Sequence, residues 1–307
     1  MGKLDRLKLW YTDEGMVGLL KSFWVTAVYL TPLYPVFERI LGQELHEKLI
    51  RSPRLGYWPN INYPQSYNEK ILHRKLHTND DRYAKLADKW RVREFVEDKV
   101  GDEILNTVYH TTTDPATIPY NKLPNQFVIK ATHGCGWNIL VENKDDVDRT
   151  DIRIQCEEWL NTSYGSRKRE YWYNQIPPKI IVEKFIDDEK YTVPRDYKFF
   201  VFHGRVEYIE VDTDRFSDHT RLFYDREWNP QEFTLEFPKA SAAEEPAQLD
   251  RMIEIAETLG ADFDHVRVDL YQPTDEDILF GEITIAHGSG TERFDPVWYD
   301  FEFGSYW

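Results

Sequence analysis

Two acidic residues and an arginine near the C-terminus have the spacing of a shared site. Successive side chains of a β-strand point to opposite faces, so Arg267 and Asp269 lie on one face of a strand that we predict over 266–271. Glu282 lies on a second predicted strand, 278–284, and a polar, turn-prone loop joins the two. If the strands pair, Asp269 and Glu282 face each other across the ladder. Two carboxylates this close repel unless a cation lies between them.

Strand alternation also predicts which residues lie on the same face of the strand as Glu282. Phe280 and Thr284 share its face of the strand. Hard oxygen ligands with no histidine or cysteine nearby indicate magnesium, and Arg267 is placed to hold a phosphate oxygen. The pattern by itself also fits two acids on a solvent-facing hairpin.

A lysine at the end of a short apolar strand is a second candidate. The strand is predicted over 126–130, and Lys130 ends it just before the turn-rich segment 133–138. Gly134 and Gly136 would let backbone N–H groups approach phosphates, and the lysine would supply a point charge. The segment lacks the Gly-x-x-x-x-Gly-Lys-Ser/Thr pattern of a P-loop. A strand-end lysine that simply reaches solvent is the alternative.

Two further strands carry charged residues in similar positions. Glu183 ends a strand predicted over 179–183, which leads into an acidic loop. Asp196 and Lys198 share one face of the strand that follows. Each of these pieces, taken alone, is also explained by an ordinary sheet edge.

The elements that must position these residues divide the chain into three stretches. Residues 1–85 have helical and irregular patterns, 86–185 alternate helix and strand, and 186–307 are richer in strand. Interspersed helices and antiparallel strands predict an α+β fold.

Local signals locate several elements. A capping box beginning at Ser66 predicts a helix over 67–77. Thr150 can cap a later helix, and an amphipathic pattern predicts another over 245–259. The residues 203–205 separate two apolar runs, which indicates a hairpin.

Composition excludes some classes of function. The 307 residues are 41% hydrophobic and 15% aromatic, which is typical of a globular protein. A net charge of −16 argues against non-specific nucleic-acid binding, so no nucleic-acid partner is expected. Two cysteines are too few for a disulfide framework, which favours a reducing cytoplasm.

An apolar segment near the N-terminus, 22–30, leaves two interpretations open. No run reaches the roughly 18 apolar residues of a membrane span, and the mixed charges before this segment argue against a signal peptide. It is either a buried packing helix or a helix that lies on a partner or a membrane surface, because Phe23, Trp24 and Tyr29 suit an interface. We expect a cytoplasmic protein, with contact at the inner face of the membrane as the second interpretation.

Taken together and in this order, the candidate segments resemble the ATP-grasp superfamily, and its TupA-like branch in particular. That branch is linked to cell-surface polysaccharide and teichuronopeptide synthesis. The resemblance runs from about residue 65 to the C-terminus. It rests on the phrases Asn68-Glu69-Lys70, Asp88-Lys89, Arg93-Glu94-Phe95, Leu123-Pro124, Phe127-Val128-Ile129-Lys130, His133-Gly134, Gly136-Trp137-Asn138, Asp196-Tyr197-Lys198-Phe199-Phe200, Val211-Asp212, Asp214-Arg215-Phe216, Val266-Arg267-Val268-Asp269-Leu270-Tyr271 and Gly281-Glu282.

The resemblance implies an ATP-grasp fold. Two α+β subdomains, 86–185 and 186–307 with the metal site, would grip ATP between them, preceded by the helical region 1–85. It also implies residues that bind the nucleotide and the metal. These are Lys89 and Lys130 for the phosphates, His133, Gly134, Gly136, Trp137 and Asn138 for the closing loop, Glu183, Lys184 and Ile186 for adenine, Asp196 with Lys198 for the ribose side, and Asp269 and Glu282 for magnesium. Thr284 stands where much of the superfamily has an asparagine as third metal ligand.

The implied activity is an ATP- and magnesium-dependent carboxylate–amine ligase that works through an acyl phosphate. Candidate residues for stabilising charge are Lys130, Arg267, Arg215 and Arg221, and His287 is a candidate to take a proton from the amine. The expected substrates are a small carboxylate and a small amine, such as an amino acid and a uronic acid or saccharide.

Two other classes of function compete with this interpretation. A polysaccharide glycosyltransferase could hold a metal and a sugar nucleotide at Asp212-Thr213-Asp214, although no Rossmann-like half precedes that triplet. A non-catalytic nucleotide-binding protein would need the lysines and carboxylates without the chemistry.

Overall fold

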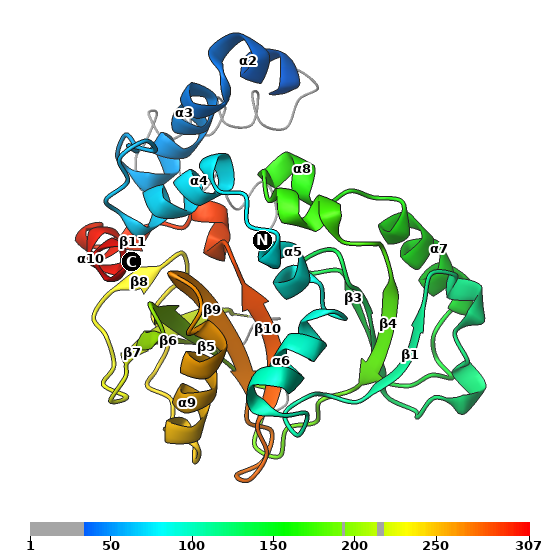
Figure 1. The fold of residues 1–307 in the computed structure, drawn as a ribbon. Coiled ribbons are helices and arrows are strands. Elements are labelled where there is room, and N and C mark those ends of the chain that lie inside the picture. The colour runs from blue at the N-terminus through cyan, green and yellow to red at the C-terminus, as the bar shows by residue number, and fades with distance from the viewer. Residues whose placement is uncertain (1–33, 192–193, 214–217) are drawn as a thin grey trace. The chain divides into compact units, whose positions relative to one another are not determined.

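The computed structural model describes residues 34–191, 194–213 and 218–307, which form two compact units (Figure 1). Of the described residues, 34–78 and 288–305 form one unit, and those of 79–287 form the other with the last two residues. Arg215 and the apolar segment 22–30 lie outside the described residues, so the roles suggested for them stay predictions. No helix in the described part of the chain is long and apolar enough to cross a lipid bilayer.

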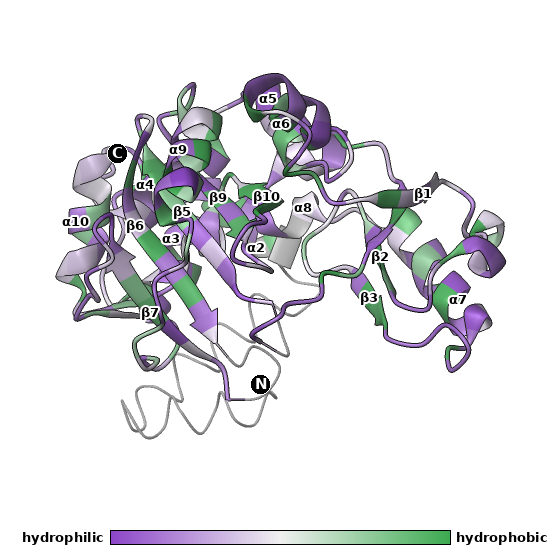
Figure 2. Ribbon diagram, turned by 90° about the horizontal axis from the view of Figure 1, so that it is seen from below, coloured by the Kyte–Doolittle hydropathy of each residue, from purple (hydrophilic) through white to green (hydrophobic). Residues whose placement is uncertain are grey.

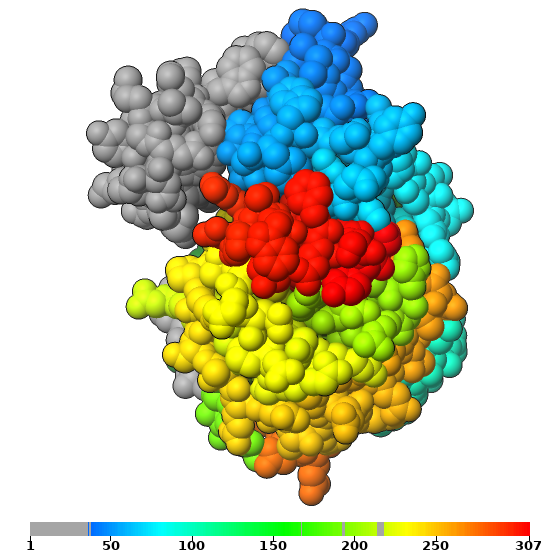
Figure 3. All heavy atoms as spheres, turned by 90° about the vertical axis from the view of Figure 1, so that its left-hand side faces the viewer, coloured from blue at the N-terminus to red at the C-terminus, as the bar shows by residue number. Residues whose placement is uncertain are grey.

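The first unit is mainly helical. Figure 3 shows its C-terminal segment against the N-terminal helices. Its elements are α2 (Tyr34–Leu41), α3 (Gln43–Leu55), α4 (Tyr67–His77), β11 (Phe294–Asp295) and α10 (Trp298–Tyr306). The predicted capping box at Ser66 is confirmed: the Glu69 N–H donates to Ser66 Oγ at 3.1 Å, and the Ser66 N–H donates to Glu69 Oε2 at 3.0 Å.

A buried aspartate ties the two chain segments of this unit together. Asp300 is only 1% exposed, and burial raises the pKa of its carboxyl. It accepts hydrogen bonds from the backbone N–H of Asn68 (2.9 Å), from the Asn68 amide (2.8 Å) and from the Tyr57 hydroxyl (2.6 Å). Asn68 is part of the Asn68-Glu69-Lys70 motif on which the family resemblance rests, and here it links helix α4 to Asp300 of helix α10.

The second unit contains a four-stranded antiparallel sheet in the order β1–β4–β2–β3 (Figure 1). Its strands are β1 (Val108–Thr112), β2 (Phe127–Ala131), β3 (Asn138–Val141) and β4 (Ile180–Lys184). The accompanying helices are α5 (Arg82–Ala87), α6 (Val92–Val100), α7 (Arg149–Leu160) and α8 (Gly165–Lys168), with the short 3-10 turns η1 (Pro115–Thr117), η2 (Tyr120–Lys122) and η3 (Tyr171–Gln175).

Helix α7 covers one face of this sheet. Its buried Ile152, Cys156 and Trp159 pack in one cluster with Phe127 and Ile129 of β2. Its cap is Asp148, whose carboxylate accepts from the N–H of Thr150 (2.7 Å). The prediction that Thr150 itself caps the helix is therefore wrong, because a carboxylate two residues earlier takes that place.

A five-stranded antiparallel sheet, in the order β10–β9–β5–β6–β7, forms the rest of this unit. Its strands are β5 (Asp196–Phe202), β6 (Arg205–Thr213), β7 (Thr220–Asp225), β9 (His265–Tyr271) and β10 (Leu279–Thr284), accompanied by β8 (Thr234–Leu235). The turn η4 (His287–Gly290) follows β10 and contains the boundary between the two units. The predicted hairpin at 203–205 is present, and its two loop residues His203 and Gly204 have φ values of 48° and 79°, as a tight two-residue turn requires.

Helix α9 (Leu249–Gly260) packs across β5, β6 and β9. A Cβ on Gly260 would come within 2.5 Å of the Val201 side chain, so glycine lets the helix end lie directly on the sheet. Alternation puts Val201 on the same face as Phe199 and Val268, all fully buried, and burial of each contributes about 1.5–3 kcal/mol. Apolar and polar bands alternate along these strands (Figure 2), so the opposite face carries the charged residues.

A β-bulge at Gly281 changes the face of one predicted neighbour. Phe280 pairs with Leu270, whereas Glu282 pairs with Asp269 two positions later, so the extra residue interrupts the alternation. Phe280 therefore shares the face of Leu270 and not that of Glu282, and the prediction for it is wrong. A Cβ on Gly281 would lie 2.9 Å from the Asp269 carbonyl oxygen, which explains the glycine.

Candidate functional site

The four-stranded sheet presents an ion pair on the face turned away from α7. Lys130 Nζ lies 2.7 Å from Glu183 Oε2, and the two side chains are 29% and 9% exposed. Asn138 pairs with Lys130 in the β2–β3 register, so it faces the same side. Three residues that the resemblance assigned to the nucleotide thus share one surface.

The loop between β2 and β3 is connected to Lys89. The Lys89 ammonium donates to the Gly134 carbonyl at 2.5 Å. A Cβ on Gly134 would come within 2.5 Å of the Trp137 ring, and Gly136 has a φ of 72°, which favours glycine. The two glycines therefore allow a tight loop packed against a tryptophan.

His133, at the start of this loop, is buried and contacts helix α7. Its ring is 2% exposed, Nε2 lies 2.9 Å from the Trp159 carbonyl oxygen, and burial lowers its pKa. Its ring also packs edge-on against Trp137, with 5.3 Å between the ring centroids. The geometry indicates a neutral, structural histidine and gives no support to direct nucleotide contact.

The backbone after Glu183 is partly committed to the sheet. The Lys184 N–H donates to the Thr107 carbonyl at 2.8 Å, and its own carbonyl accepts from the Asn106 amide at 2.8 Å. Adenine contact by Lys184 would therefore use only the second lone pair of that carbonyl. Ile186, half-buried beyond the strand end, remains a candidate for such a contact.

On the five-stranded sheet, Asp269 and Glu282 are paired across β9 and β10, as predicted. The cation between them is Arg267. Its guanidinium forks onto Asp269, with Nε–Oδ1 at 2.7 Å and Nη2–Oδ2 at 2.6 Å, and Nη2 lies 3.5 Å from Glu282 Oε1. Burial raises the pKa of Asp269 to about 7, even though Arg267 lowers it. A further cation would therefore favour the ionised carboxylate.

Glu282 connects the charges of the two sheets. Its side chain is 39% exposed. Surrounding protein tends to raise its pKa, but the charges of Lys89, Arg267 and Lys130, with the hydrogen bond from Thr284, hold that pKa below its usual value. The Thr284 hydroxyl donates to Glu282 Oε1 at 3.2 Å. Thr284 thus orients a carboxylate, and a role as third metal ligand stays a prediction.

Lys198 lies in a buried group of acids on the same sheet face. Its ammonium is 3.5 Å from Asp196 Oδ2 and 3.1 Å from Glu210 Oε1, and it also contacts Asp212. Burial lowers the pKa of Lys198, but these three carboxylates outweigh it and raise that pKa. Glu210 was missed by sequence reasoning. Its signal was the alternation of Glu210 and Asp212 on a strand facing Lys198 in the predicted hairpin.

Arg221 closes this group at the outer strand. It lies 2.8 Å from Asp212 Oδ1 and 3.0 Å from Glu210 Oε1. His219 Nε2 is 3.0 Å from the same Asp212 oxygen. Arg221 and Lys198 therefore already pair with Asp212, whereas Asp214 lies outside the described residues, so an Asp-x-Asp metal site at 212–214 stays a prediction.

His287 lies beneath Arg267 and is 4% exposed. Its Nδ1 contacts Arg267 Nη1, and its Nε2 lies 3.8 Å from Glu210 Oε2. Both ring nitrogens face protein groups, so the geometry does not support the predicted transfer of a proton from an amine.

The donor set fits magnesium that arrives with a nucleotide. Within the described ranges, no group of three or more His, Cys, Asp and Glu side chains is arranged to hold a metal ion. Magnesium usually keeps several waters and binds through one or two carboxylates plus substrate phosphates. Asp269 and Glu282, with Lys89 and Lys130 nearby, match that requirement.

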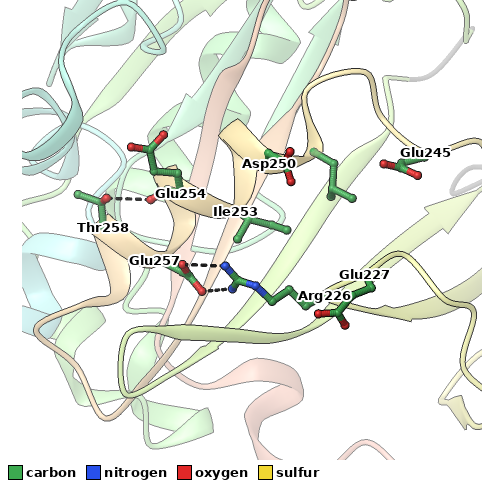
Figure 4. A pocket seen from close by; sticks show the side chains of 9 residues that line it. Arg226, Glu227, Glu245, Asp250, Ile253, Glu254, Glu257 and Thr258 are labelled. Carbon is green, nitrogen blue, oxygen red and sulfur yellow. Dashed lines mark hydrogen bonds and ion pairs between the residues drawn. The ribbon is translucent and has the colours of Figure 1, made fainter.

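A surface hollow of about 540 Å³ lies elsewhere, beside α9 (Figure 4). Most of the residues that line it are acidic. Its arginine, Arg226, pairs with Glu257: Nη1 contacts Oε1, and Nη2 lies 3.3 Å from Oε2. None of the predicted site residues lines this hollow.

A sequence comparison identifies the family of the protein. The sequence matches the family described as "TupA-like ATPgrasp" over residues 69–307. The chain is therefore an ATP-grasp protein with the α+β fold of that class. It belongs to the TupA-like ATP-grasp family. No curated protein matches the sequence significantly.

Several solved structures are similar to the chain at low identity. D-alanine–D-alanine ligase from Bacillus anthracis, complexed with ATP, shares 15% identity with a TM-score of 0.41, covering 65% of this chain and 55% of that one. L-amino acid ligase from Bacillus licheniformis shares 14% with a TM-score of 0.42, covering 84% and 57%. D-cycloserine synthetase DcsG shares 12% with a TM-score of 0.42, covering 73% and 69%. The match spans only about half the length of the first of these.

Proposed function

We propose that the protein is an ATP- and magnesium-dependent carboxylate–amine ligase. One observation carries the proposal. The positive charges of Lys89 and Lys130, which belong to the part of the unit with the four-stranded sheet, lower the pKa of Glu282. Glu282 pairs with Asp269 on the five-stranded sheet. Cations for phosphate and carboxylates for magnesium are therefore within electrostatic reach of each other.

The proposed reaction has two steps. The γ-phosphoryl group of ATP passes to the substrate carboxylate, ADP leaves, and an acyl phosphate forms. The amine then attacks the acyl carbon, inorganic phosphate leaves, and the amine loses its proton as the amide bond forms. Such transfers depend on positioning and charge stabilisation, which Lys89, Lys130 and Arg267 would supply. Asp269 and Glu282 would hold magnesium, which neutralises charge on the phosphates when bound.

The substrate pair and the cellular context extend this proposal. We propose an amino acid and a uronic acid or saccharide as substrates, in the synthesis or modification of a cell-surface polysaccharide. Family membership is the support for this setting. We place the protein in the cytoplasm, with the segment 22–30 contacting the inner face of the membrane or a polysaccharide-assembly partner.

A product assay tests the reaction class. Purified protein receives ATP, magnesium and pairs drawn from amino acids and uronic acids, and the nucleotide products are separated. We expect ADP and phosphate in equal amounts, formed only with both substrates present. AMP and pyrophosphate would mean an adenylating enzyme and would overturn the acyl-phosphate route.

Vesicle flotation tests the membrane contact. The full chain should float with vesicles, and a variant that carries both Phe23→Ser and Trp24→Ser should not. Equal flotation of both proteins would remove segment 22–30 from any membrane contact.

A further inference from the structure

Arg267 is buried among three possible acidic partners but pairs closely with only one. Its side chain is 9% exposed and forks onto Asp269, with Nη2–Oδ2 at 2.6 Å. Burial lowers the pKa of Arg267, but Asp269, Glu210 and Glu282 together raise it well above its usual value. Glu210 and Glu282 therefore compete electrostatically with Asp269 for the guanidinium.

The His287 ring lies between Arg267 and Glu210. The guanidinium only donates hydrogen bonds and does not lose its proton in proteins. His287 Nδ1, which contacts Arg267 Nη1, must therefore be an acceptor. In a neutral ring the proton then lies on Nε2, which faces Glu210 Oε2 at 3.8 Å. A doubly protonated ring would set an N–H against the N–H of Arg267.

The surroundings of His287 hold it in this orientation. The ring packs edge-on against Phe200, with centroids 5.1 Å apart and an interplanar angle of 72°. Glu210 on its other side is fully buried and is held by Lys198 at 3.1 Å and Arg221 at 3.0 Å. Burial tends to raise the pKa of Glu210, but Arg221 and Lys198 lower it, so the carboxylate stays charged and in place.

We propose that His287 is a positioning residue: through its Nδ1 acceptor it keeps the Arg267 guanidinium on Asp269 and away from Glu210. The proposal rests on the proposed function, in which Arg267 stabilises the transferred phosphoryl group and Asp269 helps to hold magnesium. Without the acceptor, Arg267 turns toward Glu210, and Asp269 loses its orientation toward Glu282.

Two substitutions separate the acceptor from the ring. His287→Phe keeps the packing against Phe200 but removes the acceptor. His287→Asn places an amide oxygen near the position of Nδ1 and keeps the acceptor. Residues that orient metal ligands typically contribute tenfold to a hundredfold in metal affinity or activity. We expect His287→Phe to lose that much in kcat and in magnesium–ATP affinity by calorimetry, and His287→Asn to recover most of it.

Nitrogen-15 NMR of histidine-labelled wild type reads the tautomer without any assay of turnover. A His287 ring protonated on Nε2 alone at neutral pH is the expected result, and a proton on Nδ1 overturns the proposal. Wild type that binds magnesium–ATP while folded His287→Phe binds and turns over equally well overturns the positioning role alone. Wild type that shows the Nε2 tautomer but binds no magnesium–ATP overturns the proposed function, and the positioning role with it.

Discussion

The two sheets of the second unit hold their charged residues in different ways. On the four-stranded sheet, Lys130 forms an ion pair with Glu183, and its side chain is 29% exposed. On the five-stranded sheet, Arg267 and Lys198 are at most 9% exposed, and each has several charged neighbours. Removal of a partly exposed charged side chain costs the fold little free energy. Removal of one member of a buried network leaves buried partners without a counter-charge and costs more. We therefore expect a substitution at Lys130 on the four-stranded sheet to lower activity with little effect on stability. On the five-stranded sheet, substitution of a buried charge should lower both.

The largest effect is expected for Arg267→Ala. It removes a phosphate-stabilising cation and leaves Asp269 buried without its hydrogen-bonded guanidinium, so both turnover and folding should suffer. Breaking a buried pair costs about 3–5 kcal/mol. Denaturant unfolding measures this change in free energy. The control is Arg251→Ala, which removes an exposed pair with Glu254 and should cost less than about 1 kcal/mol. Equal stabilities of the two variants would contradict the contrast between the sheets.

Lys130→Ala should abolish turnover while the protein stays folded. Removal of one preorganised charge stabiliser costs on the order of 10²- to 10³-fold in rate, whereas the fold should lose less, because the Lys130 side chain is 29% exposed. Steady-state kinetics and thermal melting measure the two effects separately. Lys122→Ala, an exposed lysine on η2, is the matched control and should change neither. Near-normal rates in folded Lys130→Ala would remove it from the phosphate site.

Asp212→Asn should change how stability depends on pH. Burial tends to raise the pKa of Asp212, but the His219 hydrogen bond and the charges of Lys198 and Arg221 hold it well below its usual value of 3.8. A lowered carboxyl pKa stabilises the fold above the unfolded-state pKa, and this contribution is lost as the pH falls below it. Wild type should therefore exceed the variant in unfolding free energy at pH 7, and the difference should shrink below pH 3.8. A constant difference across that range would argue against the network.

The smallest effect is expected at Thr284. Thr284→Val removes the hydroxyl that donates to Glu282 at 3.2 Å, and loss of one partly exposed hydrogen bond costs about 1 kcal/mol. Calorimetric titration with magnesium–ATP should show a several-fold weaker affinity. Thr284→Asn supplies the amide oxygen that much of the superfamily has at this position. Restored or tighter affinity in Thr284→Asn, with loss in Thr284→Val, would identify the position as a ligand position.

Strand alternation predicted the paired carboxylates correctly, because two strands joined by a short polar loop have few ways to pair. Local spacing predicted that Asp269 and Glu282 face each other, but the observed register depends on the bulge, because Phe280 pairs with Leu270 and one extra residue brings Glu282 opposite Asp269. The bulge at Gly281 was not predicted, since an extra residue leaves no mark in a period-two pattern. Alternation in the predicted hairpin does place Glu210 opposite Lys198, but it does not show whether the face that they share is buried, so Glu210 was missed.

The sequence by itself determined the family, the class of fold and the candidates for phosphate and magnesium, because these depend on residue types at short spacings. Only the tertiary structure decided which charges meet. Arg267 is two residues from Asp269, but its contact with His287 joins positions twenty apart through the sheet and the turn after it. Lys198, Glu210 and Arg221 likewise come from three different strands. Burial shifts the pKa of such groups and selects their partners, and burial depends on the packing of the whole unit, which no local pattern contains.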